Sequence, residues 1–424
     1  MEVRISPGTV NGTVVATSSK SVLQRYIAAA LLADGTTELY GISHCDDTVS
    51  CLFAVQALGA KTRELLFDTL YITGCNGNLQ PALNTIYCGE SGLAFRMLGS
   101  VAALADKELT ITGKGSLLKR PVAFFDEVLP LLQVTCKTEN GHPPIHIQGP
   151  AVPADIAIDG SLSSQFLTGL LMIYPLAKRD NIIRVKNLKS RPYIDVTLKV
   201  LNDFGIRIIN GSYETFTIPG NQAYKSCKAS IEGDWSGAAF ILVAGAVAGE
   251  VTVTQLANDS LQSDKAIMNV LKDAGAEIIY NSNSVTVKRK PLKAFSFDAT
   301  HCPDLFPPLV TLATQCEGTS TIKGVTRLIH KESNRAEALV KEFSKLNKDV
   351  ISISGDDMMI KGKLKLKATK VDSHNDHRIA MALAVAALNV VGVMHIAGME
   401  SIEKSYPRFV DDFEKLGAKV LEII

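Results

Sequence analysis

The sequence lacks the features that usually identify a metalloprotein, a membrane protein or a nucleic-acid-binding protein. Its eight cysteines never form a CxxC pair, so neither a zinc site nor a redox dithiol is indicated. Forty-four basic residues stand against 43 acidic ones, and no global field would attract nucleic acid or an anionic membrane. The most apolar run, residues 379–394, is short for a membrane span and favours a buried helix. Any binding of anions must therefore come from local clusters of charge.

The start of the chain also lacks targeting features. It has no apolar signal core and no transit-peptide bias, and the cysteines are scattered singly, as in a reducing compartment. We therefore expect a cytoplasmic protein. The length of 424 residues predicts two or three domains, and a hydrophobic fraction of 46% is enough for a large core. Aromatic residues make up only 6%, so small aliphatic side chains must fill most of that core.

Two weak patterns recur along the chain at the same interval. One is an apolar run, then Gly or Asp, then a β-rich stretch; its markers are Gly35, Asp106, Asp180, Gly249, Gly318 and Gly392. The other is a helix end that resembles Leu-x-x-Leu-Gly-Ala; its markers are Gly59, Gln133, Gly205, Gly275, Asn347 and Gly417. Both intervals are about 70 residues, which predicts six units, each with a helix, a strand, a helix and a strand. Glycine at a helix end is suited to the left-handed cap.

The first unit begins with a helix whose start is suited to an anion. Ser18 and Ser19 precede it and are expected to cap its free N–H groups. Lys20 lies in the first turn, where the helix dipole disfavours a cation unless an anion lies nearby. Ser21 and Arg25 are four residues apart and share a face near this end. One such turn could simply be solvated, but the other five units begin with similar polar or glycine-rich turns. If equivalent helices point the same way, their positive ends form a trap for anions in each half.

Nine short stretches stand in order along the whole chain and together form a specific pattern. They are Ser19–Arg25, Leu118–Pro121, Asp159–Thr168, Ser190–Asp195, Glu232–Asp234, Pro303–Asp304, His330–Arg335, Asn375–Arg378 and Lys404–Pro407. Any one of them is a weak signal. Their order and spacing resemble the enolpyruvyl transferase family, in particular the EPSP synthases (3-phosphoshikimate 1-carboxyvinyltransferases).

The resemblance implies an α/β fold of the α+β type with two domains. Each domain would be an inside-out α/β barrel of three βαβαββ units. The chain would cross between the domains twice, near Ser18 and near Glu232. The first domain would be discontinuous, with residues 1–18 and 233–424 holding units four to six. The second would consist of residues 19–232, with units one to three. We expect a monomer.

The resemblance also implies a reaction. The enolpyruvyl group of phosphoenolpyruvate would move to the 5-hydroxyl of shikimate 3-phosphate by addition and elimination. The products would be 5-enolpyruvylshikimate 3-phosphate and phosphate, on the route to chorismate and the aromatic amino acids. Neither a metal nor an organic cofactor is implied, and the partners would be small anionic substrates rather than nucleic acid or membrane. Such chemistry needs cations for phosphates and carboxylates, together with proton donors and acceptors. Since ligands would come from both domains, we also expect domain closure on binding.

The matching motifs carry over a set of site residues. Phosphoenolpyruvate would be bound by Lys20, Gly92, Arg120, Gln165, Arg335, Arg378 and Lys404. Shikimate 3-phosphate would be bound by Lys20, Ser21, Arg25, Ser163, Ser164, Gln165, Ser190, Tyr193, Asp304 and Lys331. Arginine suits this task because its planar fork meets a carboxylate or phosphate with two hydrogen bonds. Asp304 would accept the proton of the 5-hydroxyl. Glu332 and Lys20 are both candidates for proton transfer at the enolpyruvyl carbon, and the sequence does not divide that work between them.

Plainer explanations exist for single residues. Lys331, Glu332 and Arg335 could form an ordinary salt-bridged helix face. Asp304 could be a first-turn acid, and Ser163 and Ser164 could be only caps. His374 and His377 could suggest a metal, but no further ligand accompanies them.

Two other functions compete with the one that the resemblance implies. The sister transferases act on UDP-N-acetylglucosamine and carry a cysteine five residues before the arginine of their Arg-Pro pair, where this chain has Gly115. A non-catalytic anion-binding protein of the same fold is the other alternative.

The chain departs from the EPSP synthase pattern in four places. Glu90 stands where the family usually has an amide, and Leu93 where it has a hydroxyl residue. Arg327 replaces a common asparagine, and Asn334 replaces an aspartate. We therefore expect altered binding of phosphoenolpyruvate and of its mimic glyphosate.

Overall fold

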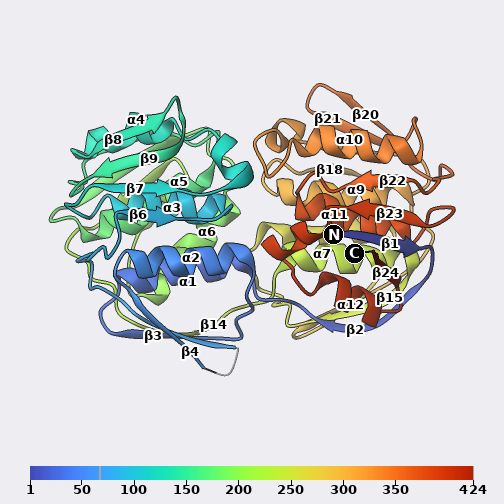
Figure 1. Cartoon of the computed structure of the whole chain (residues 1–424), viewed down its shortest axis with the longest axis horizontal. Helices are drawn as coiled ribbons and strands as arrows, with labels where there is room; N and C mark the ends of the chain where they lie inside the picture. Colours follow the sequence, from blue (N-terminus) through green and yellow to red (C-terminus); the bar gives the residue numbers. More distant parts are fainter. Residues whose placement is uncertain (66–67, 424) are drawn as a thin grey trace. The chain divides into compact units, whose positions relative to one another are not determined.

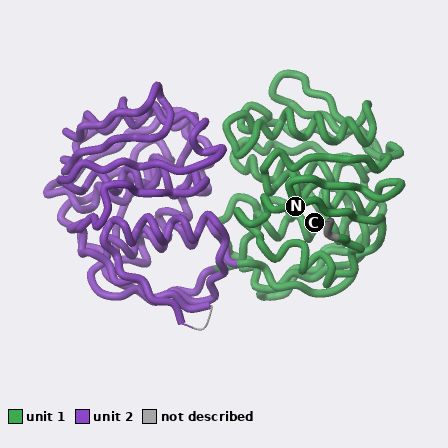
Figure 2. The backbone as a smooth tube through the Cα atoms, viewed as in Figure 1, with its two compact units in different colours: residues 1–17, 232–424 green, residues 18–231 purple. Residues whose placement is uncertain are grey.

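The computed structural model describes residues 1–65 and 68–423, and the chain divides into two compact units (Figures 1 and 2). Unit 1 consists of Met1–Thr17 and Glu232–Ile424, and unit 2 of Ser18–Ile231. Each unit contains three four-stranded sheets among the described residues. No described helix has both the length and the apolar character that a membrane crossing requires.

All six sheets have the same topology. In one of them the order is β6 (Thr85–Tyr87), β7 (Leu109–Thr112), β9 (His142–Gln148) and β8 (Thr135–Glu139). The first two strands are parallel, and the other neighbours are antiparallel. Along the chain α3 (Gly92–Ala102) joins β6 to β7, and α4 (Phe124–Val128) lies between β7 and β8. The repeat is therefore βαβαββ, which confirms the predicted fold class.

Two further repeats follow the same order without interruption along the chain. One is β10 (Ile156–Asp159), α5 (Ser164–Ile173), β11 (Asn181–Lys186), α6 (Pro192–Asp203), β12 (Ile209–Gly211) and β13 (Thr215–Ile218). The other is β18 (Ser296–Asp298), α9 (Phe306–Thr314), β19 (Thr319–Lys323), α10 (Arg335–Leu346), β20 (Ile351–Ser354) and β21 (Asp357–Lys361).

The remaining three repeats each take one strand from a distant part of the chain. The sheet of β3 (Thr36–Tyr40), β5 (Thr69–Thr73) and β4 (Lys61–Leu65) is completed by β14 (Lys228–Ser230). The sheet of β15 (Gly249–Thr254), β17 (Ser284–Lys288) and β16 (Glu277–Asn281) is completed by β2 (Val10–Val15). The sheet of β22 (Lys370–Asp372), β23 (Met394–Ala397) and β24 (Lys419–Ile423) is completed by β1 (Glu2–Ser6). The helices of these repeats are α1 (Lys20–Leu32), α2 (Asp46–Ala57), α7 (Trp235–Ala248), α8 (Ile267–Ala274), α11 (His377–Ala387) and α12 (Phe409–Lys415).

The first helix of each repeat lies in the core of its unit. Every residue of α7, α9 and α11 is buried, and these three helices contact one another in unit 1. In unit 2, α3 contacts both α1 and α5. A helix that is apolar on all sides must be buried, and the apolar run at 379–394 forms most of α11 as expected. Sheet residues alternate between buried and exposed, as in β9, so the sheets cover the helices with one face outward.

The core helices begin with side-chain caps in four of the six repeats. Ser91, Ser163, Asp234 and Asp376 each accept a hydrogen bond from a first-turn N–H at 3.0–3.2 Å. The predicted cap at α1 is wrong. Ser19 precedes α1 but makes no side-chain cap bond, and the hydroxyl of Ser18 bonds Ser43 rather than the helix. The helix α9 also lacks a side-chain cap and follows a 3₁₀ turn, η5 (Pro303–Leu305).

Glycine ends the second helix of several repeats in the left-handed conformation. Gly275 has φ of +94° and its N–H bonds the carbonyls of Leu271 and Lys272, which closes α8. Gln133 adopts the same conformation, with φ of +61°, in a copy that lacks the glycine. These ends explain why the repeat was visible in the sequence.

Candidate active site

The start of α1 holds the first group of predicted site residues in unit 2. Lys20 is the first residue of the helix, and its amine lies 2.8 Å from the carboxylate of Asp47 on α2. Both side chains are nearly buried, with 13% and 12% exposed. The unfavourable position of a lysine at the positive helix end is thus compensated within the protein by an acid from the next helix. No motif pointed to Asp47, because the pairing joins two helices rather than one turn.

Arg25 forms a second group one turn further along α1. It is 1% exposed, and its Nη1 donates to the carbonyl of Ser21 at 2.6 Å. Its Nε donates to Thr197 Oγ1 at 2.9 Å, and its guanidinium lies 5.8 Å from the ring centre of Tyr193. Burial lowers the pKa of Arg25 to about 10. The structure therefore places Ser21 and Tyr193, two other residues of the predicted site, next to the buried guanidinium of Arg25. Ser190, which precedes Tyr193, is buried and has φ of +54°.

The start of α3 is covered by two arginines. A Cβ placed on Gly92 would lie 2.5 Å from Nη1 of Arg120 and 3.0 Å from Nη1 of Arg96. A larger residue at this position would push both guanidiniums away from their places above the positive helix end. Arg96 Nη1 also donates to Oε1 of Gln165 at 2.9 Å, which connects α3 with α5. Arg96 was not among the predicted ligands, although its spacing of four residues from Gly92 places both on one face of α3.

Glu90 connects this arginine pair to the following loop. Its carboxylate accepts hydrogen bonds from the N–H and the hydroxyl of Ser116, at 3.0 and 2.9 Å. The same hydroxyl accepts from Nη2 of Arg120 at 3.3 Å. Gly115 has φ of +58°, and a Cβ there would lie 2.5 Å from the Glu90 carboxyl carbon. Glu90 thus lies beside Gly115, which leaves room for its carboxylate. Through Ser116, Glu90 also helps to position Arg120.

The serines at the start of α5 have different surroundings. Ser163 is the helix cap and accepts a hydrogen bond from the N–H of Gln165 at 3.2 Å. Ser164 is buried at the first helical position. The structure therefore gives Ser163 the structural role that the plainer explanation foresaw.

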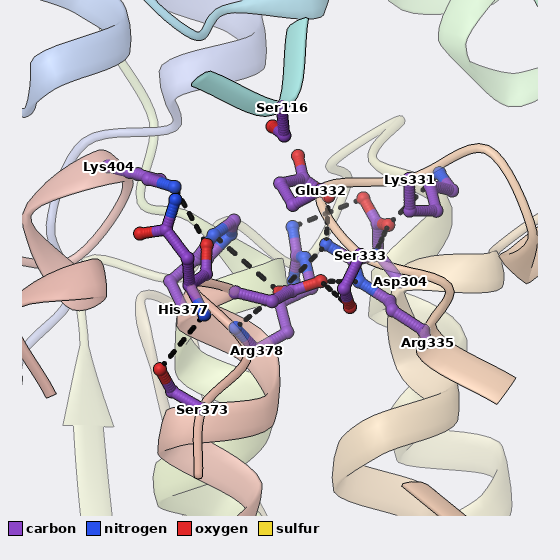
Figure 3. A network of polar contacts seen from close by, with 12 residues as sticks. Ser116, Asp304, Lys331, Glu332, Ser333, Arg335, Ser373, His377, Arg378 and Lys404 are labelled. Atoms are coloured by element: carbon purple, nitrogen blue, oxygen red, sulfur yellow. Dashed lines mark hydrogen bonds and ion pairs between the residues drawn. The ribbon is translucent and has the colours of Figure 1, made fainter. Parts of the chain in front are cut away.

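Unit 1 holds a buried network around Arg335, which we call the Arg335 network (Figure 3). Asp304, in the turn η5, accepts from Arg335 Nη1 at 2.7 Å and lies 3.2 Å from Lys331 Nζ. Its second oxygen lies 3.1 Å from Arg378 Nη2. Glu332 pairs with Arg335 as well. Three cations and two carboxylates meet here, with the two arginines buried and Lys331 still 26% exposed.

The cap of α11 completes the network. Asp376 is fully buried and accepts from Arg335 Nε at 2.7 Å and from Ser333 Oγ at 3.1 Å. Lys404, at the end of η7 (Met399–Lys404), donates to the carbonyl of Asn375 at 2.7 Å. Asp376 was not predicted as a site residue, although it lies inside a recognised motif.

The geometry of the network bears on the plainer explanations of its members. Lys331 and Glu332 precede α10, so they do not form a salt-bridged helix face with Arg335. Asp304 contacts three cations from different elements, which is more than a first-turn acid requires. Asn334, one of the departures from the family pattern, caps α10 through a hydrogen bond from the N–H of Glu337 at 3.4 Å.

Charge controls the protonation of Asp304. Burial by itself would raise its pKa, but Arg378, Lys331 and Arg335 outweigh burial and hold the pKa well below its usual range. Burial lowers the pKa of Lys331. A neighbouring buried acid behaves in the opposite way, because burial and the charge of Asp304 raise the pKa of Asp264 to about 6. Two nearby carboxyls therefore differ in their readiness to hold a proton.

The described residues contain no cluster of three or more His, Cys, Asp or Glu side chains that could bind a metal ion. The arrangement is instead suited to binding anions, since each unit gathers several arginines and lysines with few solvent contacts. A carboxylate ligand of these cations, such as Asp304, can exchange its place with an incoming phosphate or carboxylate.

Comparisons with known proteins agree on one family. Residues 5–413 match the family model described as EPSP synthase (3-phosphoshikimate 1-carboxyvinyltransferase). The chain is 37% identical over 421 residues to the 3-phosphoshikimate 1-carboxyvinyltransferase of Clostridium kluyveri, covering 99% of this chain and 98% of the relative. It is 38% identical over 429 residues to the protein of the same name from Clostridium botulinum (strain Alaska E43), with the same two coverages.

Solved structures support the same fold. An EPSP synthase from Acinetobacter baumannii superposes with a TM-score of 0.83 at 24% identity, covering 99% of this chain and 100% of that one. The enolpyruvyl transferase NikO from Streptomyces tendae superposes with a TM-score of 0.80 at 18% identity, covering 99% and 98%.

Proposed function

The chain belongs to the EPSP synthase family, and from this premise we propose which of its residues carry the reaction. It transfers the enolpyruvyl group of phosphoenolpyruvate to shikimate 3-phosphate in the shikimate pathway. We propose that the acceptor is the 5-hydroxyl and that the transfer proceeds by addition and elimination, as the family resemblance implies. The observation that carries the proposal for the site is the Arg335 network, a buried set of cations held by exchangeable carboxylates.

Phosphoenolpyruvate brings a phosphate and a carboxylate, and both units supply cations for them. Arg335, Arg378 and Lys404 would come from unit 1, and Lys20 and Arg120 from unit 2, together with the neutral amide of Gln165 and the N–H of Gly92. The two arginines over Gly92 support this role, because a helix N-terminus and a guanidinium together favour an oxyanion. Arg96 would act with Arg120 at the same place.

Shikimate 3-phosphate would be bound chiefly by unit 2. Arg25 with Tyr193 offers a buried cation beside a hydroxyl-bearing ring. The ligands we propose are Lys20, Ser21, Arg25, Ser163, Ser164, Gln165, Ser190 and Tyr193, together with Asp304 and Lys331 from unit 1. Hydroxyls and an amide are suited to a polyhydroxylated ring.

Asp304 is proposed as the acceptor of the 5-hydroxyl proton. While its carboxylate is bound to three cations, its low pKa makes it a weak base. Substrate anions would share Arg335, Arg378 and Lys331, and the loss of positive charge around the carboxylate would raise its pKa toward the range of an effective base. Substrate binding would thus make Asp304 basic enough to accept the proton. Glu332, paired with Arg335, and Lys20 would handle the proton at the enolpyruvyl carbon.

We further propose that the two units are the two domains of the enzyme, that they close on the substrates, and that the protein works as a monomer in the cytoplasm. The topology supports the division into domains, because each unit completes its own three sheets. Small-angle scattering with and without both substrates tests closure, and an unchanged radius of gyration would contradict it.

The function is tested by measuring phosphate release from phosphoenolpyruvate with different acceptors. We expect rapid release with shikimate 3-phosphate and none with UDP-N-acetylglucosamine or without an acceptor. Release only with the nucleotide sugar would point to the sister activity. Binding of phosphate without turnover of either acceptor would indicate an anion-binding protein of the same fold.

A further inference from the structure

A hydrogen-bonded pair, buried Glu342 and partly exposed His374, lies beside the Arg335 network and has no part in the reaction proposed above. Glu342 lies on α10 and its side chain is 0% exposed. Its carboxylate accepts hydrogen bonds from His374 Nε2 at 2.8 Å, from the N–H of Asp372 at 3.0 Å and from Lys345 Nζ at 2.6 Å. Burial by itself raises the pKa of Glu342, but the hydrogen bonds from Lys345, His374 and Asp372 outweigh it and leave the pKa below its ordinary value. Glu342 is therefore an ionised carboxylate that accepts hydrogen bonds from Lys345, His374 and Asp372.

The histidine belongs to a turn that the backbone does not adopt easily. His374 and Asn375 have φ of +54° and +55°, so two adjacent residues with side chains are left-handed. His374 N–H bonds Asp372 Oδ1 at 2.5 Å, and Asn375 N–H bonds Ser373 Oγ at 3.1 Å. Strained residues of this kind persist where the surrounding structure holds them and often lie at functional sites. Here Glu342 holds the turn from two sides, through the ring of His374 and the N–H of Asp372.

The same turn supplies hydrogen-bond acceptors to two proposed ligands of phosphoenolpyruvate, Lys404 and Arg335. The carbonyl of Asn375 accepts from Lys404 Nζ at 2.7 Å. The next residue, Asp376, accepts from Arg335 Nε at 2.7 Å and from the N–H of Arg378 at 3.0 Å. A shift of the turn would therefore move an acceptor of Lys404 and an acceptor of Arg335 together.

We infer that Glu342 and His374 are positioning residues for phosphoenolpyruvate. They hold residues 373–376 in the left-handed turn, so that Lys404, Arg335 and Arg378 are arranged before the substrate arrives. This arrangement lowers the cost of ordering those cations on binding. The inference rests on the proposed function, since it takes these cations to be ligands of phosphoenolpyruvate. Neither Glu342 nor His374 needs to touch the substrate.

The test compares three variants of the full chain. His374→Leu removes the hydrogen bond to Glu342 but keeps a side chain of similar size. We expect the KM for phosphoenolpyruvate to rise about tenfold, or about 1.4 kcal/mol, with the KM for shikimate 3-phosphate unchanged. The kcat should stay within about twofold, because the change affects positioning before the chemical step. His374→Gln, whose amide can still donate, should recover most of the loss.

Lys345→Met is the matched control, because it also removes a hydrogen bond to the Glu342 carboxylate but does not touch the turn. We expect it to leave both KM values unchanged. If His374→Leu behaves like Lys345→Met, or if it raises both KM values equally, the positioning role is wrong.

A second measurement does not depend on turnover. Hydrogen exchange of backbone amides 373–378 should be faster in His374→Leu than in the native protein and unchanged in Lys345→Met. Equal exchange in the native protein and His374→Leu would overturn the inference even if the enzyme is active. A native protein that releases no phosphate with either acceptor would refute the proposed function instead, and the exchange result would still decide whether Glu342 and His374 hold the turn.

Discussion

Replacing Asp304 separates its two roles, as a proton acceptor and as a ligand of three cations. In Asp304→Asn the amide oxygen can still accept from Arg335, but the negative charge beside Lys331, Arg335 and Arg378 is lost. We expect turnover to fall about 10²–10⁴-fold, the usual contribution of a positioned general base, which corresponds to about 3–5 kcal/mol in the barrier. Since the cations lose a competing anion, phosphoenolpyruvate should bind at least as tightly as to the native enzyme.

The same variant should also be less stable without substrate. Removing one partner of a buried ion pair typically costs about 3–5 kcal/mol. Because the Asp304 side chain is 19% exposed and the amide keeps part of the hydrogen bonding, the lower end of that range is expected. Saturating phosphoenolpyruvate with shikimate 3-phosphate should restore most of the loss, since substrate anions replace the missing charge.

The assays are phosphate release under saturating substrates, calorimetric titration with phosphoenolpyruvate, and thermal unfolding with and without ligands. Asp298→Asn is the control, because Asp298 lies on the same segment but is exposed and bonds Thr300, two residues along the chain, rather than the Arg335 network. Turnover of Asp304→Asn within about threefold of the native rate would refute the role as base. Equal losses in binding and turnover would show instead that Asp304 acts only in holding the cations.

Three further perturbations follow from the site. Lys20→Met should lower kcat/KM about 10²–10³-fold, whereas Asp47→Asn, which keeps the lysine, should lower kcat/KM less than about tenfold. Equal losses of kcat/KM in steady-state kinetics would contradict a direct role for Lys20. The raised pKa of Asp264 stabilises the fold at low pH, and this contribution disappears as the pH rises through about 6, so Asp264→Asn should raise the unfolding temperature at pH 8 more than at pH 5. A pH-independent difference in thermal melts would show that Asp264 does not titrate in this way. Leu93→Thr adds a hydroxyl beside Gly92 and should lower the inhibition constant of glyphosate at least about threefold, and equal constants for the two proteins would count against the role of Leu93.

The sequence predicted the sixfold repeat because its marks are local. Gly275 and Gly59 end helices with a left-handed residue, and the core helices are apolar on every side, so both leave a period in the chain. Short strands leave no such period, since β14 and β22 have three residues each. No local pattern predicts that strands from distant segments share a sheet. Val3 and Glu422, for example, pair across nearly the whole length of the chain, and this pairing is set only when the sheet forms.

The site was predicted in part for a similar reason. The cations were found because their motifs are contiguous, as with Lys20 and Arg335. Their carboxylate partners Asp47 and Asp376 come from other helices, so only the folded chain reveals them. The expected cap at Ser18 failed because its hydroxyl bonds Ser43, a residue from another segment, which no local pattern shows.

Three sheets are completed by a strand from a distant part of the chain, namely β14, β2 and β1, and this sets an order in which the chain can fold during synthesis. Unit 2 is complete once Ser230 has left the ribosome, because its last strand, β14, closes the sheet of β3. The first seventeen residues find their partner strands only later. Their strand β2 has no partner until β15 is made, and β1 must wait for β23 and β24 near the end of the chain. Until then β1 and β2 are unpaired edges that could join wrong partners, so slow translation beyond Ile231 would prolong this exposure. A circular permutant that begins at Ser18 and places the present first strands after β24 would remove the wait, at the cost of one new loop.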